Sequence, residues 1–384
     1  MTHPLRISVV VPTFNRLDTL RHVVPSLVGQ KLGRGEFEVV IADSNSTDGT
    51  AAYLAEVARD HPEVRHLPGP YTGRAAARNA GIAAARAPVV LFTDADIIAS
   101  PDLLARHLAH HDRPGVRAVV GMEVQVVSYE DYLAKRDDRA KRDPLHGERS
   151  KRLSWLYFLT GNASVPKAEL DRVGRFDEDF TGYGHEDLEL GYRLQHAGVP
   201  IVYEPGAVDY HWHPVPWEVQ QQKYELAGRS TVRFYRKHPA WDVQLRLGMT
   251  PVSLALHDVV DRVAPLKRWI ENGANRPGFA RTLSYQYHYL NGVKAALHQP
   301  AHLDHELAAQ LFSRRKGQRR RIVGVGVEDE LGEAVAVTQV DEDQPAVIAP
   351  PMHPPVDFDE PADVGGGEGA ARGAGERVIH AKLP

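Results

Sequence analysis

The chain has 384 residues and a formal net charge of −4, which gives no reason to expect a nucleic acid as partner. It contains no cysteine, so disulfides, thiolate metal sites and cysteine nucleophiles are excluded. No apolar run approaches the ~18 residues of a membrane helix. Residues 1–6 lead directly into a strand pattern without the apolar core of a signal peptide. We therefore expect a cytoplasmic protein and leave a peripheral membrane contact open.

Strand and helix patterns alternate through the first half of the chain. This alternation predicts an α/β fold with a doubly wound, mostly parallel sheet. Strands are expected at 7–13, 37–42, 64–67, 89–93, 116–127 and 200–204; helices are expected at 17–28, around 53–57, at 73–86 and 103–110, from 167, and in the segment 182–194.

The alternation ends near residue 216, which divides the chain into four predicted regions. Residues 1–215 are the α/β domain. Residues 216–300 are a helical appendage, with helices expected at 217–235, 249–263 and 279–297. Residues 301–340 are a basic linker, and residues 341–384 are a Pro- and Gly-rich tail in which we expect disorder.

Two charged segments are open to more than one interpretation. Residues 128–150 are either a solvated helix and loop or a mobile flap over a site. The run 313–321 is either a solvated segment or a contact for anionic lipid or another acidic partner.

Two aspartates follow the buried strand pattern at 89–93. Asp94 and Asp96 are separated by one residue, and in an extended chain alternate side chains point the same way. Ligands of open α/β sheets bind beyond such strand ends. Hard divalent cations prefer oxygen ligands and bridge carboxylates to phosphates. The pair therefore predicts a metal–diphosphate site, although a turn with two solvated acids is the alternative.

Five short motifs occur in a fixed order along residues 5–215, and together they resemble glycosyltransferase family 2, the inverting nucleotide-sugar transferases of the GT-A fold. Each motif alone is weak evidence, whereas the order and spacing of all five are specific. The motifs are VVVPTFN at 9–15, DSNSTD at 43–48, GRAAARNAG at 73–81, DAD at 94–96 and HED at 185–187.

The resemblance implies a site for the nucleotide sugar. It makes Asp43 the contact to the base, unless Asp43 only caps the following helix or turn. Arg74 and Arg78 lie four residues apart on one helix face, where one could reach a diphosphate and the other pair with an acid. The complete set of implied nucleotide-sugar-binding residues is Pro12, Thr13, Asn15, Asp43, Arg74, Arg78, Asp94, Ala95, Gly161 and Asn162.

The resemblance also assigns the catalytic acids. Inverting transfer needs one base on the acceptor hydroxyl. Glu186 and Asp187 are adjacent and diverge by about 100° on a helix, so they cannot share one role. Asp187 is the expected base and Glu186 orients a hydroxyl. The alternative is that both acids only interact with the helix dipole.

A histidine is the expected further metal ligand. Many family members place one after the last strand, and here His211 and His213 share one side of an extended segment. We favour His211, because Pro214 is expected to turn the chain and draw His213 outward. Asp94, Asp96 and His211 or His213 would then hold Mn²⁺ or Mg²⁺; the alternative is two surface or packing histidines.

The expected function is metal-dependent, inverting transfer of a sugar from a UDP- or GDP-sugar to an acceptor hydroxyl on a glycan, a lipid-linked molecule or a small molecule. Two alternatives remain open. One is a sugar-phosphate nucleotidyltransferase, although Pro12–Leu17 lacks the glycines that such an enzyme needs. The other is a non-catalytic nucleotide-sugar-binding protein.

Overall fold

The computed structural model describes residues 4–33, 35–137, 151–212, 217–275 and 278–299. They fall within the first of two units, Met1–His353; the second unit, Pro354–Pro384, lies outside the described residues. The predicted basic linker, the tail, most of the proposed flap and His213 also lie outside them. The described part of the predicted flap contains a helix, α5, over Tyr129–Arg136.

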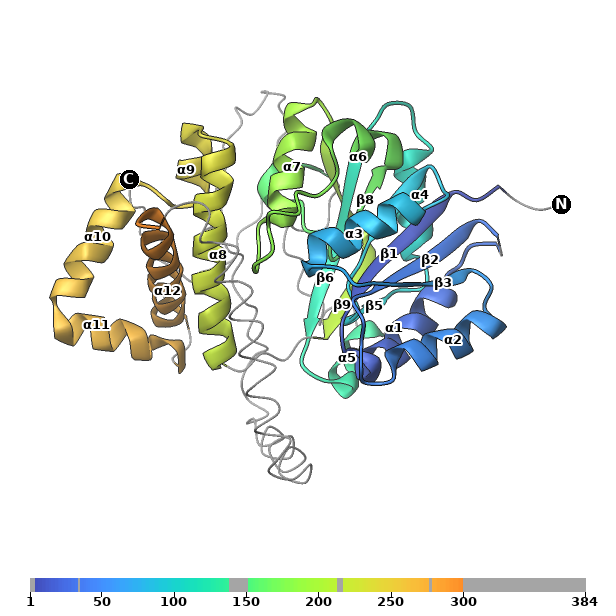
Figure 1. Ribbon diagram of the computed structural model, residues 1–384, viewed down its shortest axis with the longest axis horizontal. Coiled ribbons are helices and arrows are strands. Elements are labelled where there is room, and N and C mark those ends of the chain that lie inside the picture. Colours follow the sequence, from blue (N-terminus) through green and yellow to red (C-terminus); the bar gives the residue numbers. More distant parts are fainter. Residues whose placement is uncertain (1–3, 34, 138–150, 213–216, 276–277, 300–384) are drawn as a thin grey trace, which may run out of the picture. The chain divides into compact units, whose positions relative to one another are not determined.

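A mixed sheet forms the centre of the N-terminal half (Figure 1). Its strands run in the order β3-β2-β1-β4-β8-β6-β9-β5, with β7 paired to β9. The strand bounds are β1 Ile7–Thr13, β2 Phe37–Asp43, β3 Val64–Pro68, β4 Val89–Phe92, β5 Ile97–Ala99, β6 Ala118–Val126, β7 Lys151–Leu153, β8 Ala163–Pro166 and β9 Ile201–Trp212.

The predicted parallel arrangement is confirmed for the four strands β1, β2, β3 and β4, and for the pair of β6 and β9. Strands β5, β7 and β8 were not predicted, and each pairs antiparallel. The predicted end of the last strand at residue 204 is wrong. The register of β6 and β9 shifts between Gly121 and Met122, so a bulge accommodates residues 205–207 and the strand continues to Trp212.

Helices of the α/β half follow the predicted apolar spacing. In α1, the buried residues Leu20, Val23, Val24 and Leu27 recur at three- and four-residue intervals and face the sheet. The bounds are α1 Leu17–Val28, α2 Thr50–Asp60, α3 Gly73–Ala84, α4 Leu103–His111, α6 Lys167–Val173 and α7 Glu186–His196, with a short 3₁₀ helix at Trp155–Tyr157.

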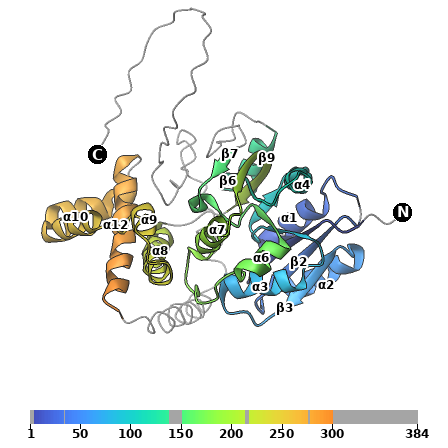
Figure 2. The same ribbon diagram turned by 90° about the horizontal axis from the view of Figure 1, so that it is seen from above.

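The three helices expected in the appendage are present, and α9 and α11 are additional (Figure 1). Figure 2 shows α8, α9, α10 and α12 from above. The bounds are α8 Trp217–Lys237, α9 Trp241–Arg246, α10 Pro251–Arg262, α11 Ala264–Glu271 and α12 Phe279–Leu297, with a 3₁₀ turn at Asn272–Asn275. Helices α8 and α12 share a core that includes Tyr224, Ala227 and Val293. Gly228 allows this contact, because a Cβ there would lie 2.0 Å from the Tyr289 carbonyl oxygen.

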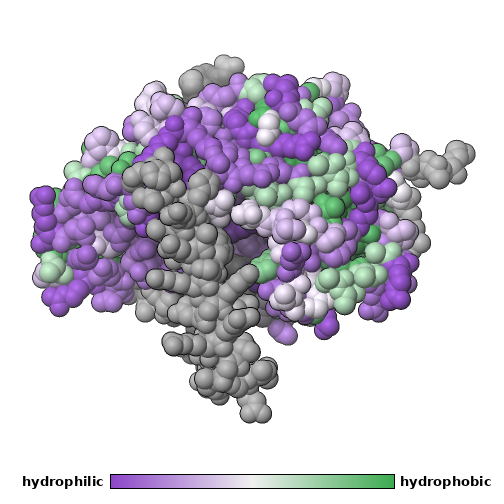
Figure 3. All heavy atoms as spheres, in the orientation of Figure 1, coloured by the Kyte–Doolittle hydropathy of each residue, from purple (hydrophilic) through white to green (hydrophobic). Residues whose placement is uncertain are grey.

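The face seen in Figure 3 is mainly hydrophilic, with apolar side chains in separate patches. Among the described residues, no helix combines the length and the apolar character needed to cross a membrane.

Candidate active site

The two aspartates of the DAD motif occupy the turn between β4 and β5. Ile97 N donates to Asp94 O, and Trp212 N on β9 donates to Asp96 O. The Thr19 hydroxyl on α1 donates to the carbonyl oxygen of Ala95 at 2.7 Å. The turn is thus fixed by a helix and a neighbouring strand, and its carboxylates lie at the carboxyl end of β4, where ligands of such sheets bind.

Arg78 on α3 connects this turn to the HED motif. Its side chain is fully buried, and it donates to Asp94 Oδ1 at 2.8 Å and to Glu186 Oε1 at 3.1 Å. Of the two predicted arginines, Arg78 is therefore the one that is buried and makes hydrogen bonds to both acids. Arg74 forms only a longer ion pair, with its guanidinium 3.8 Å from Glu186 Oε1 and 5.0 Å from the ring centroid of Tyr183. The side chain of Arg74 is 47% exposed, so it is the one that a ligand can reach.

Glu186 and Asp187 begin α7 and have different surroundings. Glu186 is buried and held by Arg78. Asp187 is partly exposed, and its Oδ1 accepts from the backbone N–H of Leu188 at 2.8 Å. Burial and the adjacent charge of Glu186 raise the pKa of Asp187 from 3.8 to about 7. Asp187 therefore has the accessibility and the proton affinity of a base that works near neutral pH.

His185 joins this motif to the appendage. It lies at the N-terminus of α7 with φ of 74°, a conformation that non-glycine residues seldom adopt. His185 Nε2 is 2.6 Å from the hydroxyl of Thr231 on α8, which is 2.5 Å from the hydroxyl of Tyr289 on α12. Tyr289 donates to the carbonyl oxygen of Leu247 at 2.6 Å. This buried series of hydrogen bonds holds His185, which directly precedes Glu186 and Asp187.

His211 lies on the other side of the DAD turn. Its Nε2 is 3.6 Å from Asp96 Oδ1, and its Nδ1 is 3.1 Å from Glu123 Oε1 on β6. Burial lowers the pKa of His211, but the charges of Glu123 and of the two turn aspartates outweigh burial and raise it to about 9. This position therefore stabilises positive charge.

Asp209 lies two residues before His211 on the same face of β9. It is fully buried, and both of its carboxylate oxygens lack a hydrogen-bond partner among the described residues. Burial, together with the charges of Glu123 and Asp94, raises its pKa well above the ordinary value. An unpartnered buried carboxylate beside other carboxylates fits a position that a cation would complete.

The donor set fits a hard divalent cation. His211 Nε2 lies beside the Asp96 carboxylate, and the charge of Asp94 also acts on His211. Glu123 accepts from the other ring nitrogen, as partners of metal-bound histidines do. Within the described ranges, however, no three side chains are already arranged as a metal shell. Diphosphate oxygens would have to contribute to the coordination.

The residues expected around the nucleotide lie at the ends of β1 and β2. Asp43 Oδ1 accepts from the backbone N–H and hydroxyl of Ser46, and its Oδ2 is 3.3 Å from His66 Nε2. Asn15 Oδ1 accepts from the N–H of Thr47. Both side chains hold the loop after β2. Asp43 caps this turn through Oδ1 alone, so base contact through Oδ2 stays a prediction. Pro12 and Thr13 are buried in β1.

Gly161 and Asn162 differ in how they can serve the site. A Cβ at Gly161 would lie 2.6 Å from Glu123 Oε2, so a larger residue here would displace the carboxylate that contacts His211. The side chain of Asn162 is in the core, where it contacts His107 and the carbonyl oxygens of Met122 and Ala207. Asn162 therefore cannot present its side chain to a donor in this conformation.

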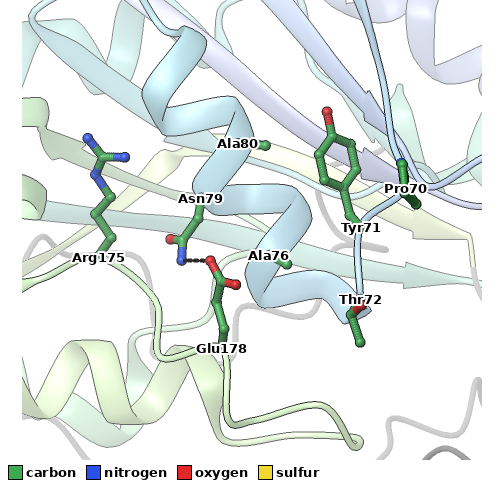
Figure 4. A pocket seen from close by; sticks show the side chains of 8 residues that line it. All are labelled: Pro70, Tyr71, Thr72, Ala76, Asn79, Ala80, Arg175 and Glu178. Carbon is green, nitrogen blue, oxygen red and sulfur yellow. Dashed lines mark hydrogen bonds between the residues drawn. The ribbon is translucent and has the colours of Figure 1, made fainter.

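A shallow pocket lies outside this cluster, between α3 and the loop at 175–178 (Figure 4). Asn79 donates to Glu178 across its floor and to the carbonyl oxygen of Phe176, which orders the loop. None of the residues predicted for catalysis lines the pocket. Its lining residues are Pro70, Tyr71, Thr72, Ala76, Asn79, Ala80, Arg175 and Glu178.

Sequence reasoning missed three residues of the site: Glu123, Asp209 and Arg16, whose guanidinium lies 4.0 Å from Asp96. Glu123 had a detectable signal, because it is a charged residue within the otherwise apolar strand pattern at 118–126. Asp209 also had a signal, because it precedes His211 by two residues and therefore shares the side of the extended segment on which His211 and His213 were placed.

Comparisons with known proteins identify the class of protein that this architecture defines. Residues 8–175 match the model of the family described as glycosyl transferase family 2, and residues 148–213 match that of the N-terminal domain of galactosyltransferase. Residues 8–175 of this chain are therefore a glycosyltransferase family 2 segment.

Individual relatives agree with this assignment. Over 273 residues the chain is 32% identical to a validoxylamine A glucosyltransferase of Streptomyces hygroscopicus, covering 62% of each protein. It is 30% identical over 240 residues to the pre-mycofactocin glycosyltransferase of Mycobacterium tuberculosis, covering 61% of this chain and 48% of that protein. The aligned part thus spans about three fifths or less of these two relatives.

A solved structure supports the fold. A mannosyltransferase from Pyrobaculum calidifontis, in complex with GDP-mannose and Mn²⁺, superposes with a TM-score of 0.53 and 21% identity. The match covers 77% of this chain and 88% of that one. The predicted GT-A type of α/β fold is therefore confirmed.

Proposed function

We propose that this protein is an inverting glycosyltransferase that moves a sugar from a UDP- or GDP-sugar to an acceptor hydroxyl with the help of a divalent cation. The observation that carries the proposal is the buried link from Asp94 through Arg78 to Glu186, which places the DAD turn beside the HED motif. Leaving-group stabilisation and proton removal are the two requirements of the reaction, and these motifs supply the residue types for both.

The proton is removed by Asp187. The acceptor oxygen forms a bond to the anomeric carbon, while the bond from that carbon to the diphosphate oxygen breaks on the opposite side. The acceptor proton passes to Asp187, whose raised pKa makes it a stronger base than an ordinary carboxylate. Glu186, held by Arg78, orients a sugar or acceptor hydroxyl.

Asp94, Asp96 and His211 would hold Mn²⁺ or Mg²⁺ together with the diphosphate, and such a cation would neutralise the charge of the leaving group. Glu123 orients His211 through Nδ1. His213 remains the alternative ligand. The exposed guanidinium of Arg74 contacts the diphosphate. The Mn²⁺ and GDP-mannose in the Pyrobaculum calidifontis complex agree with this donor and cofactor class.

The nucleotide lies over the ends of β1 and β2, next to Pro12, Thr13 and Asn15, with Asp43 Oδ2 facing the base. The backbone at Ala95, Gly161 and Asn162 lies beside the sugar. We propose a glycan, a lipid-linked molecule or a small molecule as acceptor, and the relatives named above act on acceptors of different kinds. Residues 1–215 form the transferase domain and the helical appendage supports α7.

The test is a panel of UDP- and GDP-sugars with Mn²⁺, in which free nucleoside diphosphate and pyrophosphate are measured separately. Release of UDP or GDP from one donor supports the proposal. Pyrophosphate would instead indicate a nucleotidyltransferase. Tight donor binding without any release, with every acceptor class supplied, would indicate a non-catalytic binding protein.

A further inference from the structure

Helix α10 of the appendage has an apolar face that no described residue covers. Val252 is 78% exposed, Leu256 62%, Val259 52% and Val263, the residue after the helix, 43%. Ala255, between them, is also exposed. We name these five residues the outer stripe.

The positions of these residues on the helix make the stripe continuous. At 100° per residue the five side chains fall within an arc of about 100°, and no polar residue of α10 falls within it. The opposite side of α10 is already buried, through His257 and Val260 against α11 and α12. Single exposed apolar residues are ordinary, but a whole uninterrupted helix face marks an interaction site.

The charges beside the stripe favour an anionic partner. The acids of α10 are neutralised within the appendage, since Asp258 pairs with Lys294 and Asp261 lies 3.1 Å from Lys267. Arg262 borders the stripe on the helix surface, next to Ala255. On α11, the exposed side chain of Trp269 adds an aromatic residue of the type that membrane interfaces favour.

The sequence beyond α12 strengthens this charge argument. Residues 307–327 contain six Lys or Arg and no acidic residue. A group of four to eight such cations is typical of proteins that bind anionic lipids, and stable attachment generally takes two signals. The stripe supplies apolar area, and the sequence supplies positive charge in the same chain.

We infer that the outer stripe of α10 lies in the interfacial region of an anionic lipid surface. The helix would lie parallel to that surface, with the five apolar side chains among the acyl chains and Arg262 at the headgroups. This attachment does not depend on the transferase mechanism, although it would favour an acceptor that is itself presented by a membrane.

The test is co-sedimentation of the full chain with vesicles. We expect binding to phosphatidylcholine vesicles that contain about one third phosphatidylglycerol, weaker binding at high salt, and little binding to pure phosphatidylcholine. The double variant Leu256→Glu, Val259→Glu should bind the anionic vesicles at least about tenfold more weakly. Both positions are exposed, so melting temperature and nucleotide release should stay at the wild-type level.

The double variant Val116→Glu, Val127→Glu is the matched control, because both valines are exposed in the α/β half of the chain, at 48% and 61%, and the added charge is the same. Its vesicle binding should equal that of the wild type. Equal vesicle binding by the wild type and by the variant Leu256→Glu, Val259→Glu would overturn the inference. Absence of wild-type binding to anionic vesicles would also overturn it. A wild-type dimer that becomes monomeric in the variant Leu256→Glu, Val259→Glu, without vesicle binding, would overturn it in favour of a second copy of this chain.

Discussion

Replacing Asp187 by Asn should make the protein more stable and less active at the same time. The folded protein holds a proton on Asp187 up to a pH of about 7, whereas the unfolded chain releases it near 3.8. Asp187 therefore destabilises the folded state increasingly as the pH rises from about 4 to 7. Above pH 7 this destabilisation stays constant at its full value. Three pKa units correspond to about 4 kcal/mol, and partial exposure reduces this to about 1–3 kcal/mol.

Asn cannot ionise but keeps the oxygen that accepts from Leu188, so the variant removes only this penalty. We expect the free energy of unfolding in urea to rise by about 1–3 kcal/mol at pH 8, by less than half of that gain at pH 5, and to change little at pH 4. We expect kcat to fall by about 10²-fold or more while donor affinity is kept. The wild-type rate should also fall as pH drops below about 7, because a protonated base cannot accept the acceptor proton.

Glu186→Gln is the matched control. Glu186 accepts a charge-assisted hydrogen bond from the buried Arg78, so its loss should lower stability by about 1–3 kcal/mol. If Asp187→Asn lowers the free energy of unfolding, or leaves the pH–rate profile unchanged, then Asp187 is not a catalytic base with a raised pKa. If only Glu186→Gln is inactive, the two roles are reversed.

Three other predictions concern the groups around the base. Asp94→Asn or Asp96→Asn should abolish nucleotide release with the fold retained, as should EDTA, and undiminished turnover in EDTA would refute the metal role. Asp94→Asn should also lower the melting temperature somewhat, because the buried Arg78 loses a charged partner. His211→Ala should weaken the apparent Mn²⁺ affinity in titrations with UDP. If the affinity falls in His213→Ala and not in His211→Ala, then His213 is the metal ligand. Tyr289→Phe should lower kcat several-fold with donor affinity unchanged, because it removes two of the hydrogen bonds in the series that holds His185. A variant with the wild-type kcat would show that the appendage does not position the catalytic helix α7.

Elements with a clear local pattern were predictable from the sequence. Residues such as Leu20 and Val24 in α1, and the apolar strand before Asp94, follow directly from periodicity. The end of β9 was not predictable, because Pro205 and Gly206 predict the end of a strand, whereas the pairing with β6 absorbs them in a bulge. That pairing connects residues about 85 positions apart and is invisible to local reasoning.

In the candidate site, too, the sequence predicted the local motifs but not the contacts between residues distant along the chain. The acids of the DAD and HED motifs were identified from their order along the chain, but only the folded chain shows that Arg78 joins them. The roles of Asp43 and Asn162 depend on partners distant in sequence, such as His66 and His107. Glu123 and Asp209 become neighbours only through strand register, which single-sequence patterns do not determine.

The stereochemistry of transfer tests the central claim most directly. Proton NMR can follow the sugar released when the wild-type protein hydrolyses its α-linked UDP- or GDP-sugar in the presence of Mn²⁺, before mutarotation mixes the anomers. In-line attack by a water activated by Asp187 predicts that the β-anomer appears first and that Asp187→Asn abolishes its release. Initial appearance of the α-anomer would contradict inversion and the role of Asp187 as base.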